Sequence, residues 1–290
     1  MHSVIEAMLS KYEYKTEDDY KNALKEVIQE IALLGLFRAG FFDIAACYGG
    51  TALRIFYGLP RFSEDIDFSL LMKTEDFDIR PYCKAIQAEM AAYGFDFEVA
   101  KKERAASTIE SAFIKGNTRI HFLKITSFQP PVSGVHRNEL LKIKLEVDAD
   151  PPAGANYEVK YHLAPIPFSV RIYSPGSLFA GKLHAVLCRN WNSKRIKGRD
   201  LYDYVWYLSR QIPVNIFHLE QRMKQTGHLK PNANLTTEAL SSMLYNKFQK
   251  IDYEQAKRDA LPFVRESAEL SLWSAEFFMS ITREKLKIER

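Results

Sequence analysis

The sequence has few cysteines, and their spacing does not indicate disulfide bonds that would stabilise a fold. Its 290 residues include only Cys47, Cys83 and Cys188, an odd number with no Cys-x-x-Cys pair. This usage is typical of a reducing compartment and predicts neither a disulfide framework nor a zinc site. The seven histidines are scattered without the spacing of metal ligands, and we expect His184 to be a packing residue or a polar contact.

Long apolar runs and a strong charge of one sign are also missing. No stretch approaches the roughly 18 apolar residues of a membrane span, and Glu6 and Lys11 interrupt any leader-like run. The net charge of +4 is too small to indicate a nucleic-acid binder by itself. A G-x-x-x-x-G-K-[ST] loop and a Ser-His-Asp arrangement are absent. We therefore expect a cytoplasmic protein without a membrane partner.

Hydrophobic periodicity separates a mixed α/β part from a helical part. Thr16 can cap the first long helix, and Ser174-Pro175 is a typical helix start. Helices are predicted over residues 16–37, 42–47, 52–56 and 79–93, and most of 201–288 is predicted to be helical. Strands are predicted over residues 66–70, 95–99, 109–114, 120–125, 141–147, 157–162 and 168–173. The expected domains are a helical segment (1–40), an α/β core (41–174) and a helical domain (175–290).

Two acids stand on one predicted strand. In Asp65-Ile66-Asp67, the two aspartates point to the same face because side chains alternate along a strand. Two carboxylates held about 4 Å apart repel by roughly 4 kcal/mol at an effective dielectric of 20. A bound cation or a proton relieves that repulsion, and Mg²⁺ (or Mn²⁺) suits oxygen ligands beside substrate phosphates. The ordinary interpretation is that the acids form the solvent face of an amphipathic strand.

A second acidic strand follows in LLKIKLEVDAD. Glu146 and Asp148 lie on the face opposite its apolar residues. If this strand neighbours the first, one of these two acids joins Asp65 and Asp67, and the pattern does not decide which. Three such carboxylates are the arrangement that holds two divalent ions for in-line phosphoryl transfer.

A glycine turn precedes the first acidic pair. Gly49-Gly50-Thr51 opens a short predicted helix, and free amides at a helix N-terminus suit a phosphate group. A simple turn explains the glycines equally well. The combination of glycine turn, helix and D-x-D strand favours nucleotide chemistry.

These residues resemble the signature of the polymerase-beta-type nucleotidyltransferase superfamily. More narrowly, GGTALRIFYGLPRFSEDIDF is similar to the AbiEii/AbiGii abortive-infection toxins, and SPGSLFAGKLHAVLCR followed by KGRDLYDYVWYL is a second match. The resemblance runs from about Gly49 to Leu208. It implies an α/β fold, with a polymerase-beta-like core on a mixed sheet and a C-terminal helical lobe.

The resemblance also implies a function. It indicates a cytosolic, NTP-dependent toxin of phage defence, usually encoded with an antitoxin, and some members of this family attach nucleotides to the 3′ end of tRNA. By position, Ser63, Asp65 and Asp67 match the S-x-D-x-D segment of the family, while Lys182 and Asp200 match its later lysine and aspartate. Gly49, Gly50, Thr51, Ser63 and Lys182 are the expected nucleotide-binding residues.

The residues of the second motif, which contains Lys182 and Asp200, also allow an interpretation that does not depend on the resemblance. Lys182 sits in an apolar helix stretch, and its ammonium needs either a partner such as a triphosphate or a path to solvent. Asp200 can cap the following helix, although we favour a functional role, and we expect Asp203 to be structural. The loop between the two helices carries five basic residues and Trp191, which suit a single-stranded RNA end: Arg189, Lys194, Arg195, Lys197 and Arg199. A solvated basic loop is the alternative.

The sequence thus predicts a metal-dependent nucleotidyltransferase that uses an RNA acceptor such as the tRNA 3′ end. Two alternatives remain open. The acceptor could instead be a protein or small-molecule hydroxyl, or the chain could be an inert partner-binding module that keeps the fold.

Overall fold

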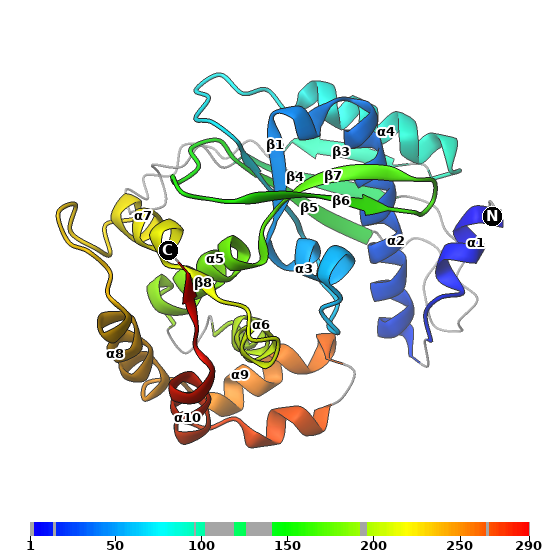
Figure 1. Cartoon of the computed structure of the whole chain (residues 1–290). Helices are drawn as coiled ribbons and strands as arrows, with labels where there is room; N and C mark the ends of the chain where they lie inside the picture. Colours follow the sequence, from blue (N-terminus) through cyan, green and yellow to red (C-terminus); the bar gives the residue numbers. More distant parts are fainter. Residues whose placement is uncertain are drawn as a thin grey trace. The chain divides into compact units, whose positions relative to one another are not determined.

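Figure 1 presents the computed structural model of the chain, which describes residues 3–13, 16–95, 97–101, 119–125, 141–191, 196–264 and 267–289. The chain divides into two compact units. Unit 1 comprises Met1–Gly58, Phe62–Pro151 and Glu158–Ile172, and unit 2 comprises Leu59–Arg61, Pro152–Tyr157 and Tyr173–Arg290. Each unit is described by itself below.

Unit 1 is built on a mixed sheet. In the described part of the chain, seven strands follow the order β3-β4-β5-β2-β1-β7-β6, and only the end residues Tyr157 and Tyr173 fall in unit 2. The strands are β1 (Ala45–Tyr48), β2 (Ile66–Leu70), β3 (Phe97–Lys101), β4 (Arg119–Ile125), β5 (Leu141–Asp148), β6 (Tyr157–His162) and β7 (Phe168–Tyr173). β2 pairs parallel with β5 and antiparallel with β1, while β1 pairs parallel with β7. The mixed α/β sheet expected from the sequence is confirmed, whereas the predicted strand over 109–114 lies outside the described residues.

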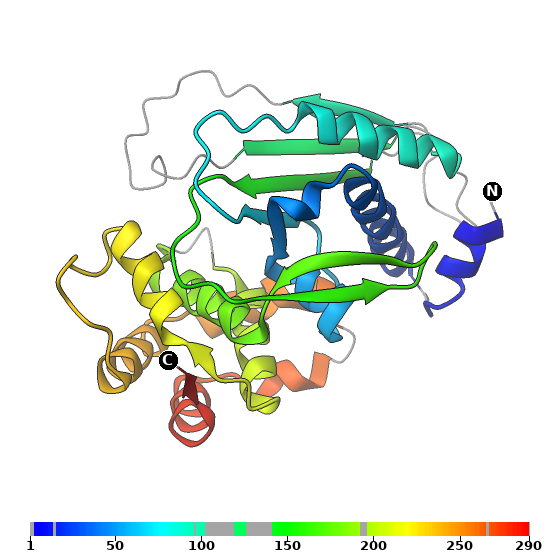
Figure 2. The same cartoon turned by 45° about the horizontal axis from the view of Figure 1, so that its top comes forward.

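The helices of unit 1 cover this sheet. They are α1 (Ser3–Leu9), α2 (Glu17–Arg38), α3 (Gly49–Tyr57) and α4 (Arg80–Ala92), with a short 3₁₀ turn at Phe41–Asp43. Helix α2 begins with a capping box, in which Thr16 Oγ1 accepts from the Asp19 amide and the Asp19 carboxylate accepts from the Thr16 amide. Helices α2 and α4 pack against each other (Figure 2), and α2 also contacts β5. The predicted start of α2 is therefore confirmed by its cap, and so is that of α5 (Pro175–Cys188), where Ser174 is the N-cap residue.

The predicted helix over residues 42–47 is wrong. Phe41–Asp43 forms one 3₁₀ turn, and Ala45 to Cys47 run as the buried strand β1 between β2 and β7. Small side chains fit this crowded central position, and the ladder pairing outweighs the helix propensity of two alanines. The neighbouring Phe41 and Phe42 are core residues, as expected, with the Phe41 ring 4.9 Å from that of Phe68.

Unit 2 is mostly helical. Its elements are α5 (Pro175–Cys188), α6 (Gly198–Ser209), β8 (Val214–Asn215), α7 (Ile216–Gln225), α8 (Thr237–Phe248), α9 (Tyr253–Ala260), 3₁₀ turns at Leu261–Phe263 and Ser267–Leu272, α10 (Ala275–Lys285) and β9 (Ile288–Glu289). Aromatic rings fill its core, where Phe179 of α5 stacks on Tyr207 of α6 at 4.3 Å. Across both units, no helix among the described residues has the length and apolar character to cross a bilayer.

Candidate functional site

Asp67 and Glu146 lie directly opposite each other in the sheet. Strands β2 and β5 run parallel, with Asp67 in register with Glu146 and Ser69 in register with Asp148. Paired residues of neighbouring strands share a face and stand about 4.8 Å apart. The two acidic strands are therefore neighbours, as the interpretation of the sequence requires, and Asp65 immediately precedes β2, with its negative charge acting on Asp67.

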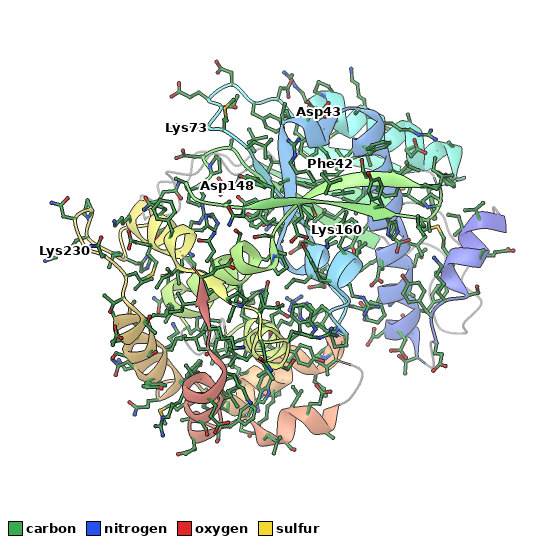
Figure 3. All side chains as sticks on the ribbon, in the orientation of Figure 1. Phe42, Asp43, Lys73, Asp148, Lys160 and Lys230 are labelled. Atoms are coloured by element: carbon green, nitrogen blue, oxygen red, sulfur yellow. The ribbon has the colours of Figure 1, made fainter. Side chains whose placement is uncertain are left out.

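The structure separates the two candidates for the third acid. Asp148 (labelled in Figure 3) is only 3% exposed, and its carboxylate accepts a hydrogen bond from the Asp150 amide at 3.1 Å, which turns the chain at the end of β5. Glu146 is partly exposed and is hydrogen-bonded to Asp67. The geometry therefore favours Glu146 over Asp148 as the partner of the aspartate pair.

Burial and neighbouring charges change the protonation of Asp67. Loss of solvent around Asp67, followed by the negative charges of Glu146 and Asp65, raises the pKa of the Asp67 carboxyl to about 7. Lys144 opposes the shift, since its ammonium is ion-paired with Glu146 on the same face of β5. The charge of Lys144 is thus too small an effect to restore the ordinary pKa of Asp67.

Gly49 makes room for this cluster. It adopts a positive φ of 79° at the start of α3, and a Cβ at this position would lie 3.0 Å from Cγ of Asp67 and closer still to a carboxylate oxygen. Only glycine combines that backbone conformation with such a close approach. The first glycine of the pair is thus explained by contact with Asp67, whereas a role in phosphate binding for Gly49 and Gly50 stays a prediction.

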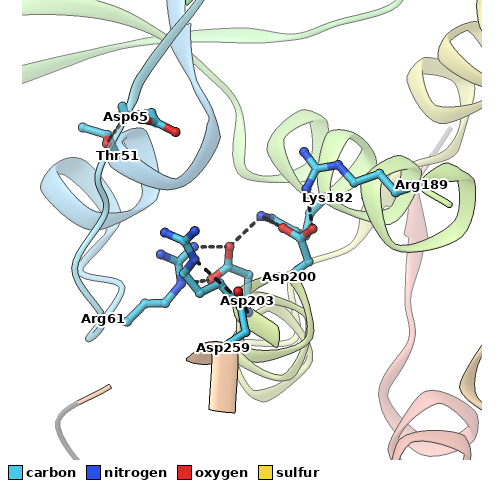
Figure 4. Close-up of polar contacts among 9 residues, drawn as sticks. Thr51, Arg61, Asp65, Lys182, Arg189, Asp200, Asp203 and Asp259 are labelled. Atoms are coloured by element: carbon cyan, nitrogen blue, oxygen red, sulfur yellow. Dashed lines mark hydrogen bonds and ion pairs between the residues drawn. The ribbon is translucent and has the colours of Figure 1, made fainter. Parts of the chain in front are cut away.

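Two internal hydrogen bonds fix the segment that leads into the acids. The buried Thr51 donates its hydroxyl hydrogen bond to the Asp65 carbonyl (Figure 4), and Gln29 of α2 donates its amide to the Ser63 carbonyl at 3.0 Å. The Thr51 hydroxyl is therefore used inside unit 1, which favours positioning of Asp65 over direct contact with a nucleotide.

The later lysine and aspartate form a separate ion-pair network within unit 2. The Lys182 ammonium lies 2.7 Å from carboxylate oxygens of both Asp200 and Asp203, and Arg61 forms a fork with Asp203 through two bonds of 2.6 Å (Figure 4). Arg189 completes the network with a 2.6 Å bond to Asp200. Lys182 and Asp200, which the sequence places on successive helices, are thus direct partners.

This network corrects the expected cap. Helix α6 has Lys197 at its N-cap, so Asp200 lies inside the first turn, and its carboxylate faces Lys182 and Arg189 instead of the helix amides. Burial alone would raise the pKa of Asp200, but Lys182 and Arg189 outweigh it and lower the value to about 2. Asp203 is structural, as expected, although its fully buried pairing with Arg61 had no signal in the sequence.

The basic residues proposed for RNA are only partly described. Lys194 and Arg195 lie outside the described residues. Lys197 is exposed, Arg189 is 47% exposed beside Asp200, and Arg199 lies 4.1 Å from the Phe263 ring and 3.9 Å from an oxygen of Asp259. These contacts leave the RNA-binding prediction untested.

The acid cluster fits a divalent ion. Oxygen-only donors from Asp65, Asp67 and Glu146 are the ligands that Mg²⁺ prefers. Lys144 does not bring the pKa of Asp67 back to its ordinary range, and a bound cation would further favour the ionised carboxylate. Carboxylates grouped in this way on a mixed sheet are typical of enzymes that transfer phosphoryl or nucleotidyl groups.

Comparison with known families agrees with this class of protein. The profile described as nucleotidyl transferase AbiEii toxin, type IV toxin–antitoxin system, matches residues 31–280. The match covers most of the chain, and the chain therefore belongs to the AbiEii family. The family predicted from the two sequence motifs is confirmed. A search of curated proteins found no match.

Solved structures of similar proteins were also found. A Helicobacter pylori protein described as a candidate nucleotidyltransferase is 18% identical with a TM-score of 0.49, over 89% of this chain and 92% of that one. The Helicobacter pylori protein JHP933 is 18% identical with a TM-score of 0.46, over 91% and 92%. An antigenic nucleotidyltransferase-like protein from Paracoccidioides brasiliensis is 17% identical with a TM-score of 0.42, over 84% and 95%. The family assignment rests on the profile match alone.

Proposed function

We propose that this chain is a divalent-metal-dependent nucleotidyltransferase that acts as a toxin by transferring a nucleoside monophosphate from an NTP to an RNA acceptor. The observation that carries the proposal is the register of Asp67 with Glu146, beside Asp65, on strands far apart in the sequence. Membership of a nucleotidyltransferase toxin family supports the reaction class.

In this mechanism, Asp65, Asp67 and Glu146 would hold Mg²⁺ or Mn²⁺. A bound divalent ion would supply positive charge to neutralise the triphosphate and the leaving pyrophosphate. Glu146, hydrogen-bonded to Asp67, would accept the proton of the attacking hydroxyl once Asp67 is ionised. Because Gly49 has no side chain, the start of α3 can lie against the Asp67 carboxylate, and the Thr51 hydroxyl donates a hydrogen bond to the Asp65 carbonyl.

The roles of unit 2 in the proposal are more limited. Lys182 and Asp200 fix helices α5 and α6 through their ion pair, and direct contact of Lys182 with phosphate would require its ammonium to exchange a carboxylate partner. We propose the tRNA 3′ end as the acceptor on the family resemblance and the basic residues around the loop between α5 and α6. A cognate antitoxin is the proposed protein partner.

The direct test is transfer of label from each α-labelled NTP to total tRNA, resolved on a gel. We expect label on tRNA with Mg²⁺ and none with Asp65→Asn, whereas Asp76→Asn, which changes an exposed acid of the same unit, keeps wild-type transfer. Parallel reactions with protein lysate and aminoglycosides separate the acceptor classes. Label in none of the three reactions, or full transfer by Asp65→Asn, would contradict the proposal.

A further inference from the structure

A second group of metal-ligating side chains lies in unit 2, away from the acid cluster in sequence and chemistry. His184 and Cys188 stand four residues apart on helix α5, and His228 belongs to the turn that follows helix α7. One ligand atom from each of these three residues lies within 4.8 Å of the other two. The expectation from the sequence, that no histidine or cysteine shows ligand spacing, is wrong for this group.

The donor set determines which ion it suits. Two imidazoles and a thiolate bind zinc or a similar borderline-soft ion, whereas Mg²⁺ prefers oxygen ligands. Residues i and i+4 share one face of a helix, and this spacing is the usual way for a helix to offer two ligands to one ion. We propose that His184, Cys188 and His228 form a zinc site that ties the C-terminal turn of α5 to the turn after α7.

Thr226 orients both rings of the proposed site. Its hydroxyl donates to the Arg222 carbonyl at 2.9 Å, and one nitrogen of His184 and one of His228 lie 2.9 and 3.0 Å from the same oxygen. A ring that donates its N–H to this oxygen keeps its other nitrogen as a lone-pair donor for an ion, and a held N–H of this kind is typical of zinc-bound histidines.

Protonation of the group is compatible with zinc. Burial, followed by the charges of Arg222 and His228, lowers the pKa of His184 to about 3, so this ring is neutral at pH 7. Burial raises the pKa of the Cys188 thiol to about 12, so the ion must displace its proton: the S–H bond breaks, a sulfur–zinc bond forms, and the proton leaves to solvent. The resulting thiolate offsets part of the positive charge of the ion, which the neighbouring charges of Arg222 and Arg189 disfavour.

The geometry requires only a small closure. Zinc bonds of 2.0–2.3 Å place tetrahedral donor atoms about 3.3–3.6 Å apart, so the three atoms, which lie within 4.8 Å of one another, would have to approach by at most roughly 1.5 Å. His228 is exposed and can make that adjustment, and the backbone of its turn is anchored by the bond from the His228 amide to the Met223 carbonyl at 2.8 Å. Three protein ligands leave the fourth position to water.

Cobalt(II) is the probe for this site, because a thiolate ligand gives a near-ultraviolet charge-transfer band that carboxylates do not. The titration is run on the full chain under reducing conditions with excess Mg²⁺, which occupies oxygen-only sites. We expect one equivalent of Co²⁺ to produce the thiolate band with tetrahedral visible bands, and added Zn²⁺ to remove both. Absence of the thiolate band in the wild-type protein would overturn the proposal.

Variants assign the ligands. We expect Cys188→Ser to abolish the band and His228→Ala to weaken Co²⁺ binding at least tenfold, while Cys83→Ser, a thiol of unit 1, and Lys230→Ala, an exposed neighbour of His228 (labelled in Figure 3), bind as wild type. His228→Ala keeps the test decisive if Cys188→Ser does not fold, because His228 lies at the surface. A band that survives Cys188→Ser, or unchanged affinity in His228→Ala, would overturn the assignment.

Discussion

Asp67 and Glu146 face each other across the parallel strands β2 and β5 and share a hydrogen bond. In a protein without a bound cation, such a pair is costly when both side chains are ionised, because neighbouring negative charges repel in a partly desolvated place. In the proposed mechanism, a bound cation would relieve that cost. The relationship leads first to a prediction in which stability and activity change in opposite directions.

The first prediction concerns Asp67→Asn. This substitution removes one charge of the pair, so we expect the metal-free protein to gain about 1–2 kcal/mol of unfolding free energy at pH 8, which corresponds to a rise in Tm of roughly 2–8 °C. Transfer of label should fall to background. Differential scanning calorimetry measures the first effect. Asp76→Asn, at an exposed acid, is the control and should leave both stability and transfer unchanged. If Asp67→Asn were less stable than the wild type, the proposed repulsion would be contradicted.

The second prediction is the pH dependence of the same group. The pKa of Asp67 is raised to about 7 in the folded protein from its ordinary value of 3.8. The folded state therefore binds more protons between these values, and stability of the metal-free protein falls as pH rises from about 4 to about 7. Divalent ions need the ionised form, so their affinity should rise over the upper part of that window and level off above pH 8. Differential scanning calorimetry of the metal-free protein measures the first trend. Calorimetric titration of Mn²⁺ at several pH values, with Asp67→Asn as reference, measures the second, and a pH-independent affinity would refute this protonation.

The third prediction compares two glycines. Gly49 and Gly58 both have positive φ, but a Cβ on Gly49 would meet Asp67, whereas nothing lies within 4 Å of a Cβ on Gly58. Each alanine substitution carries the backbone cost of about 1 kcal/mol, and only Gly49→Ala also displaces the carboxylate. We expect Gly49→Ala to lose transfer activity by at least a hundredfold while Gly58→Ala stays within a few-fold of wild type. Equal activities would show that the contact with Asp67 is unimportant.

Several elements of both units could be predicted because their signals are local. The capping box at Thr16, the alternation from Asp65 to Leu70 and the proline-led start of α5 depend on neighbouring residues alone. Strand β1 could not, since its Ala-Ala-Cys run becomes a strand through pairing with segments distant in the sequence.

The side-chain networks show the same division. The D-x-D pair and the glycine turn were visible locally, and the choice between Glu146 and Asp148 needed the register of β2 and β5. The pairing of Arg61 with Asp203 spans 142 residues, so no local pattern could indicate it. The sequence alone indicated the residue types, but it did not indicate which residues distant in the chain pair with one another.

The fourth prediction tests Thr51 as a positioning residue. Thr51→Val keeps the size of the buried side chain but removes the donor to the Asp65 carbonyl, at a cost of about 1–3 kcal/mol. Because the carboxylate of Asp65 should shift slightly, we expect kcat to fall about 10–100-fold with a smaller change in the KM for NTP. Thr51→Ser retains the hydroxyl and should recover most of kcat. A direct nucleotide contact would instead raise KM in Thr51→Val, which steady-state kinetics distinguishes.

The last prediction concerns the buried ion pair of unit 2. Arg61 and Asp203 are both almost fully buried, and their two bonds of 2.6 Å leave no room for water between the charges. Without Arg61, the buried Asp203 carboxylate loses its fork of two bonds and is left facing Lys182, so Arg61→Met should destabilise the fold by about 3–5 kcal/mol. The double variant Arg61→Met/Asp203→Leu should recover part of that loss, although Lys182 then keeps only Asp200 as its carboxylate partner.

Arg80→Met is the matched control, since the pair of Arg80 with Asp78 is largely exposed and should contribute little to stability. Urea denaturation of the three variants, each compared with wild type, gives the free energies of unfolding. A loss in Arg61→Met no larger than that in Arg80→Met would show that the buried network does not stabilise unit 2, because removing the arginine partner of a buried carboxylate should be costly.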